Sequence, residues 1–386
     1  MSITVKDNNY ISSTYGRFKV ELDYGKGSLV YDTQGKEYID MSTGIAVNTF
    51  GIADDEWNDA INLQLKKLAH TSNLYYTEPC AKLAELLCQK TDMKKVFFSN
   101  SGAEANECAI KTARRYSFKK YGEGRNYIVT LKNSFHGRTV TTLSATGQDN
   151  FHTEFGPFTE GFVYADANDF DNVKELVQKH NCCAIMMELV QGEGGVMKLD
   201  ENFVQKVADF CLENDVILII DEVQTGNGRT GSLYAFQQFG IKPDIVSTAK
   251  GLGGGLPIGA TMFGERVQNV LTPGSHGSTF GGNPVCCAAA YNIISRIDEK
   301  LLSDVKRKSD YIFKELCGAE GVKEVSGMGL MIGLELDKDV KEVIELCLEK
   351  GVLVISAKSR LRLLPALNIP DELLHKAIKV IKECVK

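Results

Sequence analysis

Two residues of opposite charge, Asp221 and Lys250, each follow an apolar run of the sequence. A carboxylate at the end of the most apolar run is costly unless it meets a positive or donor group. Lys250 is followed by four glycines in five residues, an environment that allows close ligand approach and a lowered amine pKa. A neutral amine can form a Schiff base and move a proton, while a fixed carboxylate keeps a pyridinium nitrogen protonated. A structural ion pair or helix cap would explain Asp221 equally well, and most lysines are solvated surface groups.

A polar segment at residues 99–106 lies between an apolar run and a helical pattern. Ser101 and Glu104 have capping-box spacing, and Gly102 would permit a tight turn. Alternatively, the backbone N–H groups of Gly102 and Ala103, aided by the helix dipole, could hold a phosphate. Taken alone, the segment fits both interpretations.

A GxGxxG pattern at residues 226–231 raises the alternative of a dinucleotide site. Two observations disfavour it. Asp221 and Glu222 would face the pyrophosphate, and no carboxylate about 20 residues further on ends a strand, as ribose recognition requires. The glycines after Lys250 do not form a dinucleotide site either, because they lead into the strand-like run 259–263 and not into a helix.

Apolar runs alternate with helical patterns between Lys95 and Gly264, which predicts an α/β fold with a mostly parallel sheet and helices on both faces. The runs are continuous, as expected for strands buried on both sides. Expected strands cover 96–98, 127–131, 184–190, 216–220 and 244–247, with a helix around 203–211. Ligands bind beyond the carboxyl ends of such strands, which are followed by residues 99–104, 188–195, 221–224 and Lys250.

Length and pattern predict three parts. Residues 46–285 form a large cofactor-binding domain, and residues 286–386 form a smaller α+β domain with helices near 297–316, 340–349 and 372–385 and a strand near 330–336. Residues 1–45 carry two strand-like pieces, 20–24 and 29–31, which we expect to pack with the small domain.

The composition is that of a folded globular protein, with 43% hydrophobic and 24% charged residues. A net charge of -6 excludes a broad positive field for nucleic acid. Eleven cysteines without CxxC spacing indicate reduced thiols and no metal site. The first ten residues lack the apolar segment of a signal peptide, and no window approaches a membrane span, so we expect a cytoplasmic location.

Six motifs in order resemble the class III aminotransferases of the fold-type I group, and among them the acetylornithine aminotransferases most closely. They are Ser-Gly-Ala-Glu-Ala-Asn at 101–106, Phe-His-Gly-Arg-Thr at 135–139, Gln-Gly-Glu-Gly-Gly at 191–195, Asp-Glu-Val-Gln-Thr-Gly at 221–226, Ala-Lys-Gly at 249–251 and Gly-Ser-Thr-Phe-Gly-Gly-Asn-Pro at 277–284. The likeness runs from Thr14 to Pro365, nearly the whole chain.

The resemblance implies pyridoxal 5'-phosphate as the cofactor. Lys250 would hold it as a Schiff base and later act as general acid and base. Asp221 would pair with its pyridine nitrogen, Gln224 would lie by its phenolic oxygen, and Phe135 would stack on its ring.

The phosphate would be bound by Gly102 and Ala103, joined by Thr279 of the partner subunit. The resemblance thus implies a homodimer with shared active sites. We expect His136 and His276 to be structural histidines.

The same resemblance implies the substrate contacts. Arg138 would take the distal carboxylate of the donor, and Ser278 would contribute at that end. Arg362 would hold the α-carboxylate of glutamate or 2-oxoglutarate, and Glu193 would mask Arg362 while an ω-amino substrate is bound. Glu188 would support the site.

The implied reaction moves the δ-amino group of N2-acetylornithine to 2-oxoglutarate, a step of arginine biosynthesis. It gives N-acetylglutamate 5-semialdehyde and glutamate. Donors that would keep the mechanism are succinylornithine, ornithine, 4-aminobutyrate and succinyl-diaminopimelate. An aminomutase or decarboxylase on the same fold is a further alternative, which the presence of Arg138, Arg362 and Glu193 together argues against. From different classes, an NAD-binding dehydrogenase or a non-catalytic binding protein remain.

Overall fold

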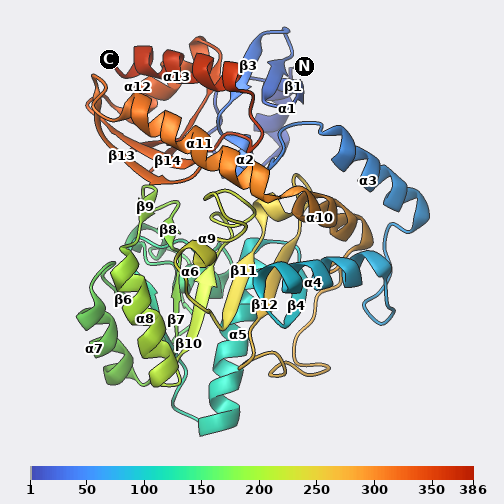
Figure 1. Ribbon diagram of the computed structural model, residues 1–386, viewed down its shortest axis with the longest axis vertical. Coiled ribbons are helices and arrows are strands. Elements are labelled where there is room, and N and C mark those ends of the chain that lie inside the picture. The colour runs from blue at the N-terminus through green and yellow to red at the C-terminus, as the bar shows by residue number, and fades with distance from the viewer. Residues whose placement is uncertain (1) are drawn as a thin grey trace.

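A seven-stranded sheet forms the centre of the larger part of the protein (Figure 1). The computed structural model describes residues 2–386. The strands lie in the order β4 (Lys95–Ser99), β12 (Gly259–Phe263), β11 (Ile245–Thr248), β10 (Ile217–Asp221), β7 (Cys182–Met187), β5 (Tyr127–Leu131) and β6 (Phe162–Ala165). Only β12 runs antiparallel to its neighbours. The predicted α/β class with a mostly parallel sheet is confirmed.

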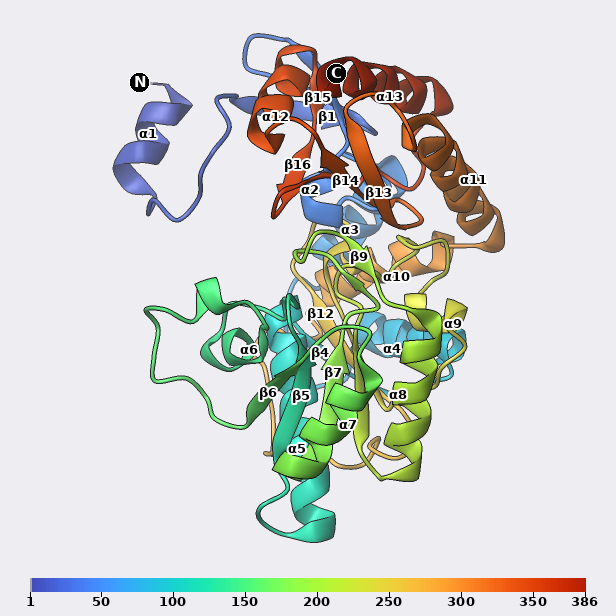
Figure 2. The ribbon, with the colours of Figure 1, turned by 90° about the vertical axis from the view of Figure 1, so that its left-hand side faces the viewer.

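Helices cover both faces of this sheet (Figure 2). On one face, α5 (Gly102–Tyr121) packs on Ile217 and Ile219 of β10. On the other, α8 (Glu201–Glu213) packs on Leu218 and Ile220. The helices α4 (Glu78–Thr91) and α7 (Phe170–His180) share the face with α8. Because successive side chains of a strand point to opposite faces, both sides of β10 are apolar, which explains its continuous apolar run.

The five predicted strands and the helix near 203–211 are present as β4, β5, β7, β10, β11 and α8. β7 and β10 are parallel neighbours joined through α8. The edge strand β6 was not predicted, because four residues, three of them partly exposed, carry too weak a pattern. The GxGxxG segment at 226–231 forms turns with no helix beginning there, and the nearby α9 (Ala235–Gln238) is a single turn. The dinucleotide interpretation is therefore wrong.

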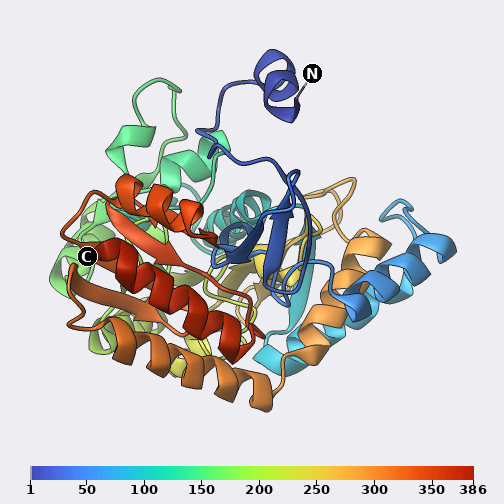
Figure 3. The same cartoon turned by 90° about the horizontal axis from the view of Figure 1, so that it is seen from above.

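A second sheet, order β13-β14-β17-β16, forms the smaller part with three helices (Figure 3). Its strands are β13 (Val322–Met328), β14 (Met331–Leu336), β17 (Arg360–Leu363) and β16 (Ile355–Ala357), and its helices are α11 (Glu299–Leu316), α12 (Val340–Glu349) and α13 (Asp371–Val385). The three helices and the strand near 330–336 occur where the patterns predicted them.

The N-terminal strands join the C-terminal part. A third sheet contains β1 (Leu22–Lys26), β2 (Leu29–Asp32), β3 (Glu37–Asp40) and β15 (Val352–Leu353), with β15 parallel to β3. Ile39 and Met41 belong to the same apolar cluster as Val352 and Ile378. These contacts agree with the expected association of the N-terminal segment, whereas the boundaries at 45 and 285 stay predictions.

The remaining elements include α10 (Pro284–Arg296), which packs into the main core, and several short or peripheral ones. The latter are α1 (Ile3–Tyr10), α2 (Thr43–Ala46), α3 (Asp55–Lys67), α6 (Val140–Ala145), β8 (Val190–Gln191), β9 (Met197–Lys198) and the 3-10 turns η1 (Asp149–Phe151) and η2 (Lys250–Leu252). Figure 2 shows α1 standing apart from the body of the chain, and none of its residues is buried. Within residues 2–386, no helix combines the length and apolarity required to cross a bilayer.

Candidate active site

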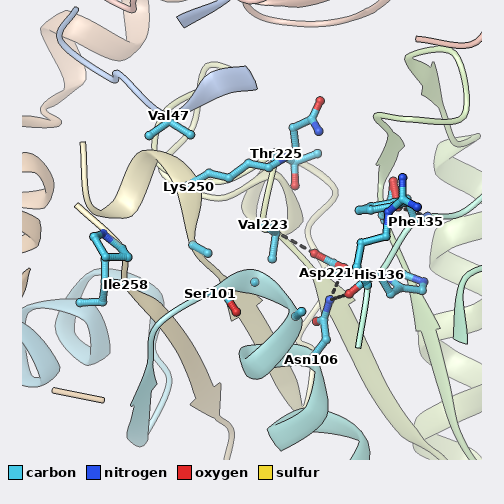
Figure 4. A pocket seen from close by; sticks show the side chains of 18 of the residues that line it. Val47, Ser101, Asn106, Phe135, His136, Asp221, Val223, Thr225, Lys250 and Ile258 are labelled. Carbon is cyan, nitrogen blue, oxygen red and sulfur yellow. Dashed lines mark hydrogen bonds and ion pairs between the residues drawn. The ribbon is translucent and has the colours of Figure 1, made fainter. Parts of the chain in front are cut away.

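A cavity of about 470 Å³ opens at the carboxyl ends of β10 and β11 (Figure 4). Nine of the predicted site residues line it: Gly102, Ala103, Phe135, Arg138, Glu188, Glu193, Asp221, Gln224 and Lys250. They come from loops that follow different strands, as expected where parallel strands end together. The fold thus assembles the predicted residues in one place.

The carboxylate of Asp221 is buried, with 3% of the residue exposed, and is held by three donors. Asn106 donates from Nδ2 to Oδ2 over 2.7 Å, and His136 lies with Nδ1 2.8 Å from the same oxygen. The backbone N–H of Val223 donates to Oδ1 at 3.0 Å. Because an ionised carboxylate only accepts, Nδ1 of His136 carries the proton of that bond. These donors stabilise a negative charge at the end of β10.

Lys250 reaches into the cavity from the turn after β11 (Figure 4). Burial lowers the pKa of its amine to about 8, Glu193 opposes that change, and Arg362 adds to it. Lys250 also has a φ of +47°, which a side-chain-bearing residue rarely adopts. A non-glycine residue persists in such a conformation only where its surroundings hold it, often at functional sites. The prediction of a depressed amine pKa agrees with this environment.

The N-terminus of α5 forms another wall of the cavity. Ser101 caps the helix by accepting from Glu104 N–H at 3.2 Å, whereas the Glu104 side chain accepts from the backbone N–H of Asn100, so only one half of the predicted capping box forms. Gly102 and Ala103, the first two helical residues, line the cavity. The first N–H groups of a helix have no intrahelical acceptor, so they are available to a phosphate. A Cβ on Gly102 would lie 2.7 Å from Val223 Cγ1, so a larger residue would force the walls apart.

Glu188 connects two walls of the cavity. Its Oε1 accepts from the backbone N–H of Phe135 at 2.8 Å, and its Oε2 accepts from Gly192 N–H at 3.0 Å. Burial raises the pKa of Glu188 to about 7. Phe135 and the turn that carries Glu193 are therefore fixed relative to each other through one carboxyl group.

Arg362 lies behind this turn on β17 and forms an ion pair with Glu193. Its Nη1 is 2.6 Å from Glu193 Oε1 and donates to Gln224 Oε1 at 3.2 Å. Burial raises the pKa of Glu193, but the charge and hydrogen bond of Arg362 outweigh it and bring that pKa below its usual value. Arg362 Nε is buried and has no hydrogen-bond partner among residues 2–386. The guanidinium thus keeps an unused donor beside the cavity.

Arg138 is an exposed residue at the edge of the cavity. Its guanidinium carbon lies 4.2 Å from the ring centroid of Phe151 and 5.5 Å from that of Phe135. Stacking of this kind uses the face of the guanidinium and leaves the N–H groups along its edge free for a carboxylate.

Besides Arg362, two predicted residues do not line the cavity within one chain. The hydroxyl oxygen of Ser278 accepts from Asn100 Nδ2 at 3.1 Å and from the backbone N–H of Gly281 at 2.9 Å. Thr279 lies on an exposed loop. Since Thr279 was expected to act in the partner's site, its role stays a prediction.

The sequence reasoning missed two side chains that hold Asp221. His136 was expected to be structural, yet it lines the cavity and contacts the carboxylate directly. Asn106 contacts both Asp221 and the carbonyl of His136, the latter at 2.8 Å. Both lie in motifs that were recognised, but nothing local indicates that they meet Asp221. His276 lies elsewhere, against Lys111 Nζ at 2.9 Å.

The donor set fits pyridoxal phosphate. A buried carboxylate, an amine of lowered pKa, an aromatic ring and a free helix N-terminus match its pyridine nitrogen, aldehyde, ring face and phosphate, respectively. Among residues 2–386, no group of three or more His, Cys, Asp or Glu side chains is arranged to hold a metal ion.

Comparison with known proteins agrees with this geometry. Residues 10–385 match the model of the family described as aminotransferase class-III. The chain belongs to the class III aminotransferases. This membership confirms the predicted family, its transaminase chemistry and its pyridoxal phosphate cofactor, and it excludes the dehydrogenase and the non-catalytic binding protein.

Three similar proteins illustrate the range of the family. The acetylornithine aminotransferase of Haemophilus ducreyi is 51% identical over 379 residues, covering 98% of this chain and 96% of the relative. A solved N-acetylornithine aminotransferase from Stenotrophomonas maltophilia has a TM-score of 0.86 and 33% identity, covering 99% and 98%. The ornithine aminotransferase of Toxoplasma gondii, described with partial occupancy of PLP at its active site, has a TM-score of 0.94 and 32% identity, covering 99% and 93%.

The pKa of Lys250 predicts how the apoenzyme takes up its cofactor. Covalent attachment requires the neutral amine, whose share is half at pH 8 and falls about tenfold for each further unit below. The rate of reconstitution, followed by the absorbance of attached pyridoxal phosphate, should therefore rise with pH and level off above about 8. Glu193→Gln removes a charge that raises this pKa, so its profile should move to lower pH. A wild-type midpoint near the ordinary lysine value would contradict the assignment.

Proposed function

We propose that this transaminase transfers the δ-amino group of N2-acetylornithine to 2-oxoglutarate in the cytoplasm, as a step of arginine biosynthesis. The observation that carries the proposal is the presence at one site of an exposed guanidinium, Arg138, and a masked one, Arg362. The acetylornithine aminotransferase of Haemophilus ducreyi, similar over almost its whole length, supports the choice of donor.

Pyridoxal phosphate, when bound, supplies an aldehyde that accepts the amino group and a ring that accepts electrons from a breaking C–H bond. Asp221 would keep the ring nitrogen protonated, and Phe135 would pack on the ring face. Gly102 and Ala103 would hold the phosphate through their N–H groups. Gln224 would lie by the phenolic oxygen.

Lys250 would bind the aldehyde carbon between reactions and, once released by the substrate, move a proton. Its lowered pKa leaves a useful fraction of neutral amine near neutral pH, so it can take a proton and return it. Its left-handed backbone, set between Ala249 and the glycines that follow, restricts where the amine can point.

Arg362 and Glu193 would allow one site to accept two kinds of substrate. The carbon that carries the reacting amine bears only hydrogen atoms and a methylene chain in acetylornithine, but a carboxylate in glutamate. With Glu193 in place, Arg362 is neutralised and the first substrate meets no unpaired buried charge. When Glu193 moves aside, Arg362 can bind the α-carboxylate through two parallel hydrogen bonds.

Exposed apolar side chains near the cavity support a homodimer. Leu74, Tyr76 and Phe280 are 60% or more exposed. Asn73 joins their two loops by donating to the carbonyls of Ser278 and Gly281 at 3.0 and 2.7 Å. A cluster of this kind is typical of a surface covered by another protein. A second copy seated there would lie close to Thr279, as a shared phosphate site requires.

Lys250 should be the point of cofactor attachment. Borohydride treatment of the purified yellow enzyme should fix the cofactor to the peptide that contains Lys250, as read by mass spectrometry. Lys250→Ala should still bind pyridoxal phosphate through Asp221 and the α5 N-terminus, but it should show no borohydride-stable label and should lose at least about 1000-fold in kcat, because the general base is absent. A label on another lysine would refute the assignment.

Arg138 should determine donor affinity. Among acetylornithine, ornithine, succinylornithine, 4-aminobutyrate and succinyl-diaminopimelate, acetylornithine should give the highest kcat/KM with 2-oxoglutarate. Arg138→Gln should raise the KM for acetylornithine by about 10- to 100-fold, the loss expected for charge-assisted hydrogen bonds to a carboxylate.

Lys132→Gln is a matched control for Arg138→Gln, because it removes an exposed positive charge that is paired with Asp166 at 2.8 Å. It should leave the KM unchanged. If another donor exceeds acetylornithine, the donor assignment fails while the reaction class stands.

The apolar cluster should hold the dimer together. Tyr76→Glu should shift the wild-type dimer towards monomer in sedimentation velocity, because a charge would be buried at the interface. Activity should fall with the dimer fraction, since Thr279 would no longer reach the partner's phosphate. Leu212→Glu places the same charge on a residue 71% exposed on α8 and should change neither property. A monomeric wild-type enzyme with full activity would contradict the shared site.

A further inference from the structure

The glycine-rich segment at residues 226–231 is left without a role once the dinucleotide interpretation is excluded. It continues the loop that begins with Asp221 and carries Gln224. A Cβ on Gly228, whose φ is +87°, would lie 2.7 Å from Leu367 Cδ1. Only glycine therefore allows this turn to approach the segment after β17 so closely.

Arg229 lies in the middle of this turn and is 3% exposed. Its Nη1 donates to the carbonyls of Leu330 and Pro365, at 3.1 and 2.5 Å. In return, its own carbonyl accepts from Leu330 N–H at 2.9 Å. Leu330 immediately precedes β14, and Pro365 follows β17 by two residues. One guanidinium thus holds the neighbouring ends of two strands of the small sheet.

The direct partners of Arg229 are carbonyls and not a carboxylate. Burial lowers its pKa to about 9, opposed by the charge of Asp40. The Oδ1 atom of Asp40 already accepts from the backbone N–H groups of Ser42 and Thr43, each at 2.9 Å. A buried cation with neutral partners is expensive. An apolar side chain could fill the space, but it could not bond both carbonyls.

The contacts of Arg229 bear directly on the position of Arg362. Pro365 lies three residues after Arg362, and Gly333 of β14 is the strand partner of Arg362. At the other end of the loop, Gln224 accepts from Arg362 Nη1 at 3.2 Å. The loop that begins at Asp221 therefore touches the guanidinium of Arg362 through Gln224 and holds its strand through Arg229.

We propose that Arg229 is a positioning residue that sets the distance of Arg362 from the reacting centre, and so determines affinity for substrates with an α-carboxylate. The proposal rests on the role of Arg362 in the proposed function. Acetylornithine does not use Arg362, so its half-reaction should be insensitive to Arg229. Glutamate and 2-oxoglutarate should be sensitive to it.

The test compares the two half-reactions in Arg229→Lys and Arg229→Met by single-turnover absorbance of the cofactor. We expect KM for 2-oxoglutarate and for glutamate to rise at least 10-fold, which corresponds to about 1.4 kcal/mol of binding free energy. The kcat should stay within about threefold of the wild-type value. The half-reaction with acetylornithine should stay within about twofold. The Kd of glutarate, an unreactive dicarboxylate that we expect to bind in the same place, should rise by the same factor as the KM. Arg229→Lys keeps the charge and serves if Arg229→Met does not fold.

Lys308→Met is the matched control. Lys308 is also a buried cation and contacts the same segment after β17, where it donates to the carbonyl of Leu367 at 3.2 Å. It belongs to α11, however, and pairs with Asp304 at 2.6 Å. It should lower Tm without changing the ratio of the two half-reactions. Equal losses in both half-reactions of the Arg229 variants, or an unchanged glutarate Kd, would overturn the proposal. If the wild type ignores acetylornithine but reacts with glutamate, the donor assignment fails, while glutamate and glutarate still test Arg229.

Discussion

The site depends on keeping one buried carboxylate charged close to an amine that must lose its charge. Removal from water favours the neutral form of both groups, so a charged Asp221 requires hydrogen-bond donors that Lys250 does not. Asp221 receives hydrogen bonds from Asn106, His136 and the backbone of Val223, which offset the cost of burying its charge. Lys250 lies in a buried position that lowers its pKa to about 8. Hydrogen-bond donors around Asp221 and desolvation of Lys250 thus place a negative charge and a neutral amine in the same cavity.

The order of the central sheet brings the partners of Asp221 together. The side-chain partners of Asp221 come from α5, which follows β4, and from the loop after β5, and these two strands lie on opposite sides of β10 in the sheet. Because β4, β5 and β10 are parallel to one another, the segments that follow them meet at one edge of the sheet, where short side chains can contact each other. Helix α5 contributes twice, because its first residues face the cavity and Asn106, one turn later, bonds Asp221.

A second buried charge, that of Arg362, lies at the boundary between the large and small parts. Arg362 arrives from β17 of the small sheet, whereas Glu193 and Gln224 come from loops of the large one. A cation buried there is tolerable only with a partner, and Glu193 is a partner that a substrate carboxylate can replace. Gly228 of the 226–231 turn permits a close approach between this loop and Leu367, four residues after β17.

The amino-acid sequence by itself determined the α/β class, most of the central strands, the family and the position of Lys250 and Asp221 at strand ends. It did so because continuous apolar runs and glycine-rich turns are local signals that any parallel sheet must carry. The roles of Arg362 and Glu193 came only from resemblance, since 169 residues separate them along the chain.

Only the tertiary structure decided what holds Asp221. Asn106 and His136 lie 115 and 85 residues from it, and no propensity or spacing encodes a hydrogen bond between them. The short strands β6, β15 and β16 were missed for a related reason, because two to four residues are held in place by their neighbours more than by their own pattern. Likewise, the GxGxxG pattern left a nucleotide site as a disfavoured alternative, and only the tertiary structure shows that Gly228 packs against Leu367 in the segment after β17. Local sequence sets backbone preference, whereas side-chain partners depend on which distant segments the packed core brings within reach.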